Sequence, residues 1–205
     1  MDAGAPTTAF NDGWPRYIGS VAAENRSIFR FTLPSNNVGT ITKVELFLYS
    51  AERGGAAFNC LLYQLRRSDW VQSQATWNIF KTSNNWGTAG AKNTASDYIN
   101  TIIDQAATPS VGNWYSLVLL GTGADNAVTL NWGDTFDGLI AGDVVSAGRY
   151  IGHHGAGGTE PYVVITYTPN GPENMKTMNG LAKTTGMKSI NGLAMASVKS
   201  RNGLA

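Results

Sequence analysis

The C-terminal end of the chain repeats one short motif three times, over residues 175–182, 187–194 and 198–205. Each copy has the form Lys-x-x-Asn-Gly-Leu-Ala preceded by an apolar residue. A unit of about a dozen residues cannot bury a core of its own, so such repeats pack on one another, on the preceding domain or on other chains. We therefore predict a folded body over residues 1–169 and an assembly or anchoring tail over residues 170–205, with the boundary at Pro169-Asn-Gly-Pro172.

The Asn-Gly pair in each copy predicts a tight β-hairpin. A type I′ turn needs positive φ at both central residues, and Asn-Gly supplies this at the lowest cost. An isolated two-stranded hairpin is only marginally stable in water, so apolar side chains of the copies must share a core. The residues expected to carry assembly are Met175, Met178, Asn179, Gly180, Leu181, Met187, Ile190, Asn191, Gly192, Leu193, Val198, Asn202, Gly203 and Leu204.

Strand patterns dominate the body. Arg26–Leu33 alternates two faces, and Ile41–Tyr49 places Lys43 and Glu45 on one face and Thr42, Val44 and Leu46 on the other. Many short strands with polar connections predict an all-β fold, specifically a jelly-roll β-sandwich. Residues 69–94 are expected to form a long ordered connection, and Ala95–Ala107 fits either a helix or a strand over 98–103. Further strands are expected over Phe58–Leu65, Asn113–Leu120, Ala127–Trp132, Val144–Ile151 and Tyr162–Thr168.

Composition favours an extracellular or virion protein over a cytosolic enzyme. Only 14% of residues are charged, against about 25% in average soluble proteins. The tail carries five basic residues and one acid, 5 − 1 = +4, while the whole chain has a net charge of +1. This charge could favour an acidic partner, or it could only keep the repeats soluble. We expect no nucleic-acid partner and no membrane span, and we expect that residues 1–6 do not form a signal peptide.

Side chains that could carry chemistry are few and scattered. Cys60 is the only cysteine and lies in an apolar run, which predicts a buried thiol. His153 and His154 are neighbours in sequence, so in a strand they would point to opposite faces; we expect a polar loop there. Asp125, Asp134 and Asp137 could ligate a structural calcium ion, although turn chemistry explains them equally well. We expect no cofactor beyond this and no enzymatic activity.

The six tryptophans divide by their neighbours in the sequence. Trp77 and Trp114 lie in apolar or patterned segments and are expected in the core. Trp86 is flanked by polar and small residues, so it is the best candidate for an exposed ring that stacks on a sugar. Trp14 and Tyr17 in Trp14-Pro-Arg-Tyr17 are the next candidates for glycan binding.

Several segments together resemble the DNRLRE-type β-sandwich family. They are Asn25–Phe31, Ile41–Tyr49, Asn113–Leu117, Pro161–Tyr167 and, most specifically, Asp69-Trp-Val-Gln-Ser-Gln-Ala-Thr-Trp-Asn78. The resemblance covers roughly residues 3–168, and the Asn-Gly repeats resemble tails of phage-like and metagenomic surface proteins. Two departures stand out. The family's opening strand is absent or very short, which leaves a sheet position empty or open to the tail or another chain, and Gln72 stands where an acid is common.

The resemblance implies a non-catalytic jelly-roll module of surface or secreted proteins, some of which bind glycans. Together with the repeats, it leads to one main hypothesis: a structural or adhesion protein on a virion or extracellular surface. It would form a homo-oligomer, with a trimer favoured, or join a larger capsid or surface assembly through the tail. The alternative is a carbohydrate-binding module that recognises a surface polysaccharide.

Overall fold

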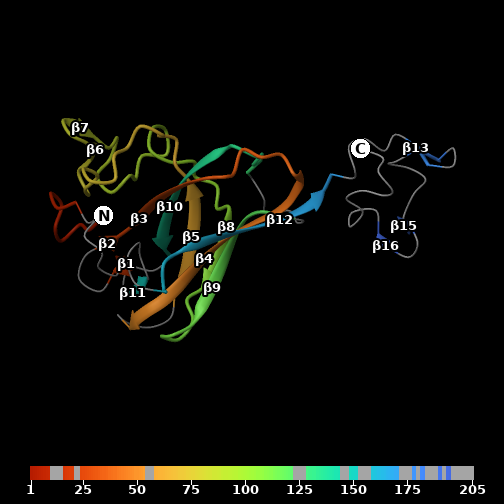
Figure 1. Cartoon of the computed structure of the whole chain (residues 1–205). Coiled ribbons are helices and arrows are strands. Elements are labelled where there is room, and N and C mark those ends of the chain that lie inside the picture. The colour runs from red at the N-terminus through yellow and green to blue at the C-terminus, as the bar shows by residue number, and fades with distance from the viewer. Residues whose placement is uncertain are drawn as a thin grey trace.

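The computed structural model describes residues 1–9, 16–20, 24–53, 58–121, 128–143, 148–151 and 158–170, and four residue pairs in the tail. For residues 16–20, 52–53, 148–151 and the tail pairs, only the backbone is described. The described residues form strands, bridges, turns, bends and irregular loops, with no helix among them. The chain is all-β, and its two larger sheets are antiparallel and enclose a common core, which is compatible with a β-sandwich (Figure 1).

The first sheet is organised around one long strand, β4 (Gly39–Arg53). β9 (Trp114–Leu120) pairs with residues 44–49 of β4. β12 (Tyr162–Pro169) pairs with residues 39–47, and β11 (Gly148–Ile151) pairs with residues 50–53. β9 and β12 overlap along β4, so they lie on its opposite sides (Figure 1). Two further strands extend the sheet from β11: β1 (Arg16–Ser20) and then β2 (Glu24–Asn25).

The second sheet has the strand order β3-β10-β5-β8. Its strands are β3 (Ser27–Thr32), β10 (Thr135–Gly142), β5 (Asn59–Gln64) and β8 (Asp104–Ala107). The two sheets are tied together along one side, where the Asp104 carboxylate accepts a hydrogen bond from the backbone N–H of Val118 in β9 at 2.6 Å. This link keeps β8 and β9 together although they belong to different sheets.

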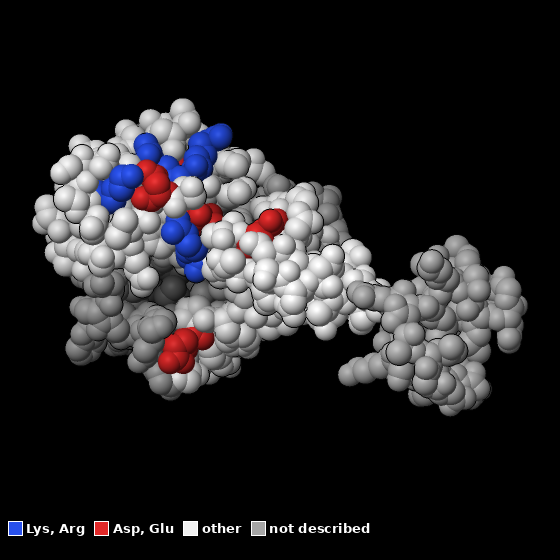
Figure 2. Space-filling model, turned by 45° about the horizontal axis from the view of Figure 1, so that its top comes forward, with Lys and Arg blue, Asp and Glu red and all other residues white. Residues whose placement is uncertain are grey.

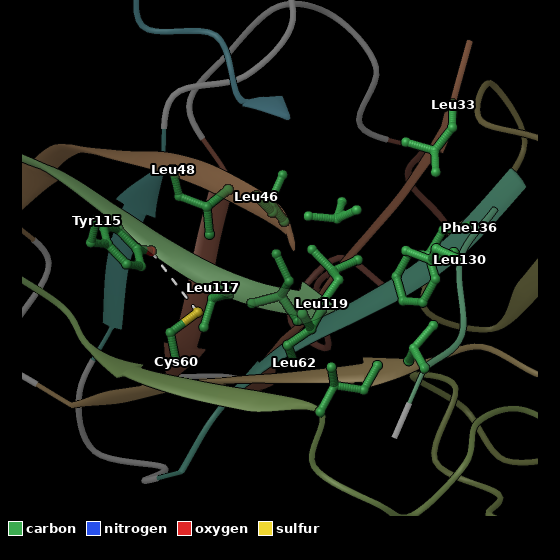
Figure 3. Close-up of a cluster of buried hydrophobic side chains, with 14 of the residues drawn as sticks. Leu33, Leu46, Leu48, Cys60, Leu62, Tyr115, Leu117, Leu119, Leu130 and Phe136 are labelled. Carbon is green, nitrogen blue, oxygen red and sulfur yellow. Dashed lines mark hydrogen bonds between the residues drawn. The ribbon is translucent and has the colours of Figure 1, made fainter. Parts of the chain in front are cut away.

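The main core lies between the two sheets. Leu46 and Leu48 of β4 and Leu117 of β9 face Cys60 and Leu62 of β5 (Figure 3). Cys60 is fully buried and free, as predicted, and the Tyr115 hydroxyl lies 3.9 Å from its Sγ. Burial raises the pKa of the Cys60 thiol to about 12, so it stays protonated and unreactive at neutral pH.

A second apolar cluster covers the other face of the second sheet. Leu65 and Leu139 lie beneath Trp70, Phe80 and Trp86, which come from the connection between β5 and β8. This connection spans residues 65–103 and carries the small hairpin β6 (Ile79–Lys81) and β7 (Asn84–Asn85). The predicted ordered connection over residues 69–94 is therefore a layer that packs on the second sheet.

Most Lys and Arg side chains visible in Figure 2 lie in one area of the surface.

One buried carboxylate organises this layer. Asp97 accepts hydrogen bonds from the backbone N–H groups of Gly87, Thr88 and Asn93, at 2.8, 3.1 and 3.1 Å, and from the Ser96 hydroxyl at 3.0 Å. It is fully buried. A short polar side chain that satisfies several loop N–H groups replaces the hydrogen bonds that a regular strand or helix would make.

Most of the predicted strands are confirmed, and three expectations are wrong. Ala95–Ala107 is neither a helix nor a strand over 98–103, because residues 95–103 turn and bend and the strand starts at Asp104. Residues 128–132 form no strand, although Val128 and Leu130 are buried in the core. The strand there is instead Thr135–Gly142, the central β10. Thr42 is exposed at a bulge between β4 and β12 rather than facing inward.

In the tail, the described residues of the first two repeats are short paired strands. β13 (Thr177–Met178) pairs with β14 (Leu181–Ala182), and β15 (Ser189–Ile190) pairs with β16 (Leu193–Ala194). Met178 faces Leu181 and Ile190 faces Leu193 in the register, so two residues lie between the strands of each pair. The Asn-Gly residues, the remaining assembly residues and the third repeat lie outside the described residues.

Candidate binding surface

Four aromatic side chains gather on the outer face of the first sheet. Leu46 and Leu48 of β4 point into the core, so the alternation of the strand turns Phe47 and Tyr49 outward. In the register of the sheet, Tyr49 is opposite Trp114 of β9, and Phe47 is opposite Tyr162 of β12. We call the surface formed by Phe47, Tyr49, Trp114 and Tyr162 the aromatic platform.

The rings of the platform contact one another across the three strands. Phe47 and Tyr162 are stacked, with ring centroids 4.9 Å apart and an interplanar angle of 1°. Trp114 meets Tyr49 at 5.1 Å and Tyr162 at 5.0 Å, both edge to face. Trp114 is 37% exposed and Tyr162 is 45% exposed. The indole ring therefore holds its place by contacts with two other rings while it offers surface to a partner.

The polar groups next to the platform are mainly uncharged hydroxyls. Ser116 lies opposite Phe47 on the β9 side, and the tyrosines Tyr49 and Tyr162 carry hydroxyl groups. Further along the same face of β4, Lys43 Nζ and Glu45 Oε1 form an ion pair at 2.7 Å. The two charges offset each other, so the described side chains of this face combine apolar rings with hydroxyls and carry little net charge.

Trp86, the first candidate for glycan binding from the sequence, is buried in the structure. Trp86 is 4% exposed, its indole Nε1 donates to the Thr76 carbonyl at 3.0 Å, and its ring packs on Phe80 at 5.5 Å. The expectation of an exposed Trp86 is wrong because its polar neighbours in β7 face solvent while the indole turns towards the second sheet. Trp14 lies outside the described residues, and Tyr17 lies in β1 opposite Tyr150, with its side chain not described.

The two tryptophans expected in the core have different outcomes. Trp77 is 8% exposed, which confirms the prediction, whereas Trp114 is among the most exposed apolar side chains described. A signal for this was present in Asn113–Leu120, because strict alternation puts Trp114 on the face opposite Tyr115, Leu117 and Leu119. The exposed face of β4 follows from the same rule, because Phe47 and Tyr49 alternate with the buried residues Leu46, Leu48 and Ser50.

The candidate calcium ligands make hydrogen bonds to protein groups. Asp134 Oδ2 accepts from the backbone N–H of Asn131 at 2.7 Å. Asp137 Oδ1 accepts from Arg30 Nε at 2.7 Å and from Trp70 Nε1 at 2.5 Å, beneath the loop layer. Asp125, His153 and His154 lie outside the described residues. In the part of the chain that the structure describes, no three His, Cys, Asp or Glu side chains are grouped so as to hold a metal ion.

Comparison with known proteins gives no relative from which a function could be transferred. No protein-family model matches the chain, and no curated protein matches it. Among the described residues there is no helix that is long and apolar enough to cross a membrane. The candidate surface therefore depends on the geometry of its own residues.

Proposed function

We propose that this chain is a non-catalytic adhesion protein of a virion or extracellular assembly, and that its aromatic platform binds a surface polysaccharide. The observation that carries the proposal is the contact between the exposed rings of Trp114 and Tyr162, 5.0 Å apart on the outer face of the first sheet. Folded chains normally bury large aromatic side chains, and a contiguous group of exposed ones marks a binding surface.

The chemistry of the platform suits a sugar chain. The ring of a hexopyranose has an apolar face of C–H groups that packs on an aromatic ring, and its hydroxyls need hydrogen-bond partners. Trp114 and Tyr162 supply rings with a polar group at one end, and Ser116 and Tyr49 add hydroxyls beside them. Because Lys43 and Glu45 neutralise each other, we favour an uncharged polysaccharide over a strongly charged one.

The same geometry supports a binding role without catalysis. Hydrolysis of a glycosidic bond generally needs two carboxyl groups that flank the bond, roughly 5–10 Å apart. Among the described side chains on the face of the platform, the acid is Glu45, and it is paired with Lys43 at 2.7 Å. This carboxylate is thus engaged as a structural counter-charge.

We also propose that the body is a jelly-roll sandwich of the DNRLRE type. The segment with the most specific resemblance supports this, because its side chains build the loop layer as a unit. Trp70 and Trp77 are both buried, and the Thr76 hydroxyl accepts hydrogen bonds from the backbone N–H groups of Asn78 and Ile79, each at 3.2 Å. A motif shared by a family is expected to supply the residues that pack one structural unit, and this segment does so for the loop layer.

Deleting the repeats tests the assembly part of the proposal. We expect a chain ending at residue 170 to contain fewer copies per particle by light scattering than the full chain at the same molar concentration, because paired repeats are too small to be stable alone and gain a core by packing between copies. The trimer is our favoured state. Equal numbers of copies for the two chains would contradict a tail that assembles copies, and would leave anchoring to a foreign partner as its role.

Truncating the platform tests the binding proposal. We expect Trp114→Ala and Tyr162→Ala each to weaken binding to the recognised polysaccharide at least about tenfold, which corresponds to about 1.4 kcal/mol, because each removes a ring on which a sugar would stack. Depletion or affinity electrophoresis against a panel of neutral and charged polysaccharides measures this. Tyr167→Ala is the matched control, because Tyr167 is a 40% exposed ring on β12 outside the platform. Binding that survives both platform substitutions would rule out the site.

A further inference from the structure

Strand β12 carries no charged side chain on either of its faces. Its inward side chains Val163 and Ile165 pack against the main core. On its outer face, Tyr162 and Val164 are 45% and 37% exposed. After the bulge, Tyr167 is opposite Ile41, which packs on the core, and its ring lies 5.3 Å from that of Trp132. An outer face next to solvent normally carries polar residues, so apolar residues there indicate surface that a partner covers.

The position of β12 in the sheet also leaves its edge unprotected by charge. It ends the first sheet, and in the described part of the chain it pairs only with β4. Edge strands are usually protected against pairing with other chains by charged side chains, by proline or by their short length. Residues 162–169 contain no charged residue and reach their only proline at Pro169, the last residue of the strand. Among the residues that the structure describes, β12 is therefore an edge strand with almost none of the usual protection.

We propose that β12 pairs with β12 of a second copy of this chain, antiparallel and about a two-fold axis. An uncharged strand meets no like-charge repulsion when it pairs with itself, and a two-fold axis lets the same apolar residues serve on both sides. A charged partner strand would find no counter-charge on this edge. The pairing joins the first sheets of two copies into one continuous sheet.

The consequence for binding is that the two aromatic platforms come to lie on one sheet surface. Tyr162 belongs both to the platform and to the edge strand, so each platform extends to the junction between the copies. One eight-residue edge buries little area, so the pair is weak in isolation, with a dissociation constant on the order of 10–100 µM. On a polymeric ligand, two linked platforms act together and bind more tightly than either alone.

A charge placed on the edge tests this pairing in the full chain. We expect Val164→Lys to lower the mass measured by light scattering, and to weaken association at least about tenfold. Val111→Lys is the matched control, because Val111 is a 43% exposed valine in the connection between β8 and β9. Association through the repeats or through a foreign chain would not respond to Val164→Lys, so an unchanged mass overturns the proposal, as does a wild-type chain that is a monomer throughout this concentration range.

Single cysteines along β12 give a second readout that does not depend on mass. In an antiparallel pair, residues near the two-fold axis lie opposite their own copies, with Cα atoms about 4.5–5.5 Å apart, which is within disulfide range. We expect one of Val164→Cys and Thr166→Cys to form a covalent dimer under mild oxidation, and Val111→Cys to remain monomeric. The native Cys60 does not interfere because its buried thiol has a pKa of about 12. Equal crosslinking at all three positions would show random collision and overturn the pairing.

Discussion

Replacing Asp97 with alanine is expected to lower the free energy of unfolding by about 3–5 kcal/mol. The substitution removes a fully buried acceptor that three backbone N–H groups and the Ser96 hydroxyl share, in a partly buried site. Donors that lose their partner where the access of water is restricted cost more than the net value of the hydrogen bonds themselves. Denaturant titration followed by tryptophan fluorescence measures the loss, since Trp70, Trp77 and Trp86 all lie in the layer that Asp97 organises.

Two variants separate this effect from a general loss of an acid. Asp97→Asn keeps one oxygen acceptor and a similar shape, so it should lose less than Asp97→Ala. Asp69 lies in the same connection and pairs with Lys81 at 2.7 Å, but its side chain is 50% exposed. Because exposed ion pairs contribute little, Asp69→Ala should change the free energy of unfolding by less than about 1 kcal/mol. If Asp97→Ala and Asp69→Ala cost the same, the hydrogen-bond account of the loop layer is wrong.

The first sheet could be read from the sequence because each of its well-patterned strands alternates between a core face and an outer face. Leu46, Leu48 and Leu117 mark the inner face, and the residues between them are the outer face. The aromatic platform was therefore encoded in the same alternation that defined the strands. The prediction of a buried Trp114 follows from its apolar, patterned segment, whereas its position in the alternation of the strand places it on the outer face. Cross-strand register, which brings Trp114 beside Tyr162, is a long-range property that one strand does not contain.

The loop layer and β10 were harder to predict for physical reasons. Trp86 sits among polar residues in sequence, and only the fold of the connection shows that its indole reaches the second sheet. In β10, the pair Asp137-Gly138 looks like a turn, yet both residues lie inside the strand. Asp137 is neutralised by Arg30, and Gly138 leaves room for the ring of Phe29, which would otherwise clash with a Cβ atom at 2.1 Å. Tertiary contacts thus override a local turn signal.

Phe136 in β10 offers the second large expected effect, because it lies in the main core against two phenylalanine rings of β3. It is 1% exposed, and its ring lies 5.9 Å from that of Phe29 and 5.6 Å from that of Phe31. We expect Phe136→Ala to lower the free energy of unfolding by about 3–5 kcal/mol, as buried Phe→Ala changes generally do, from lost transfer energy and a residual cavity.

The conservative variant shows whether the cavity is the cause. Phe136→Leu retains most of the side-chain volume, so we expect a loss of about 1–2 kcal/mol, which includes the lost contacts between the rings. Urea titrations of both variants should give the wild-type m-value, which would show that the surface exposed on unfolding has not changed. Equal losses for the two variants would mean that Phe29 and Phe31 collapse into the space. In that case the sheets would be held together mainly by the leucines between β4, β9 and β5, and not by the aromatic group of β3 and β10.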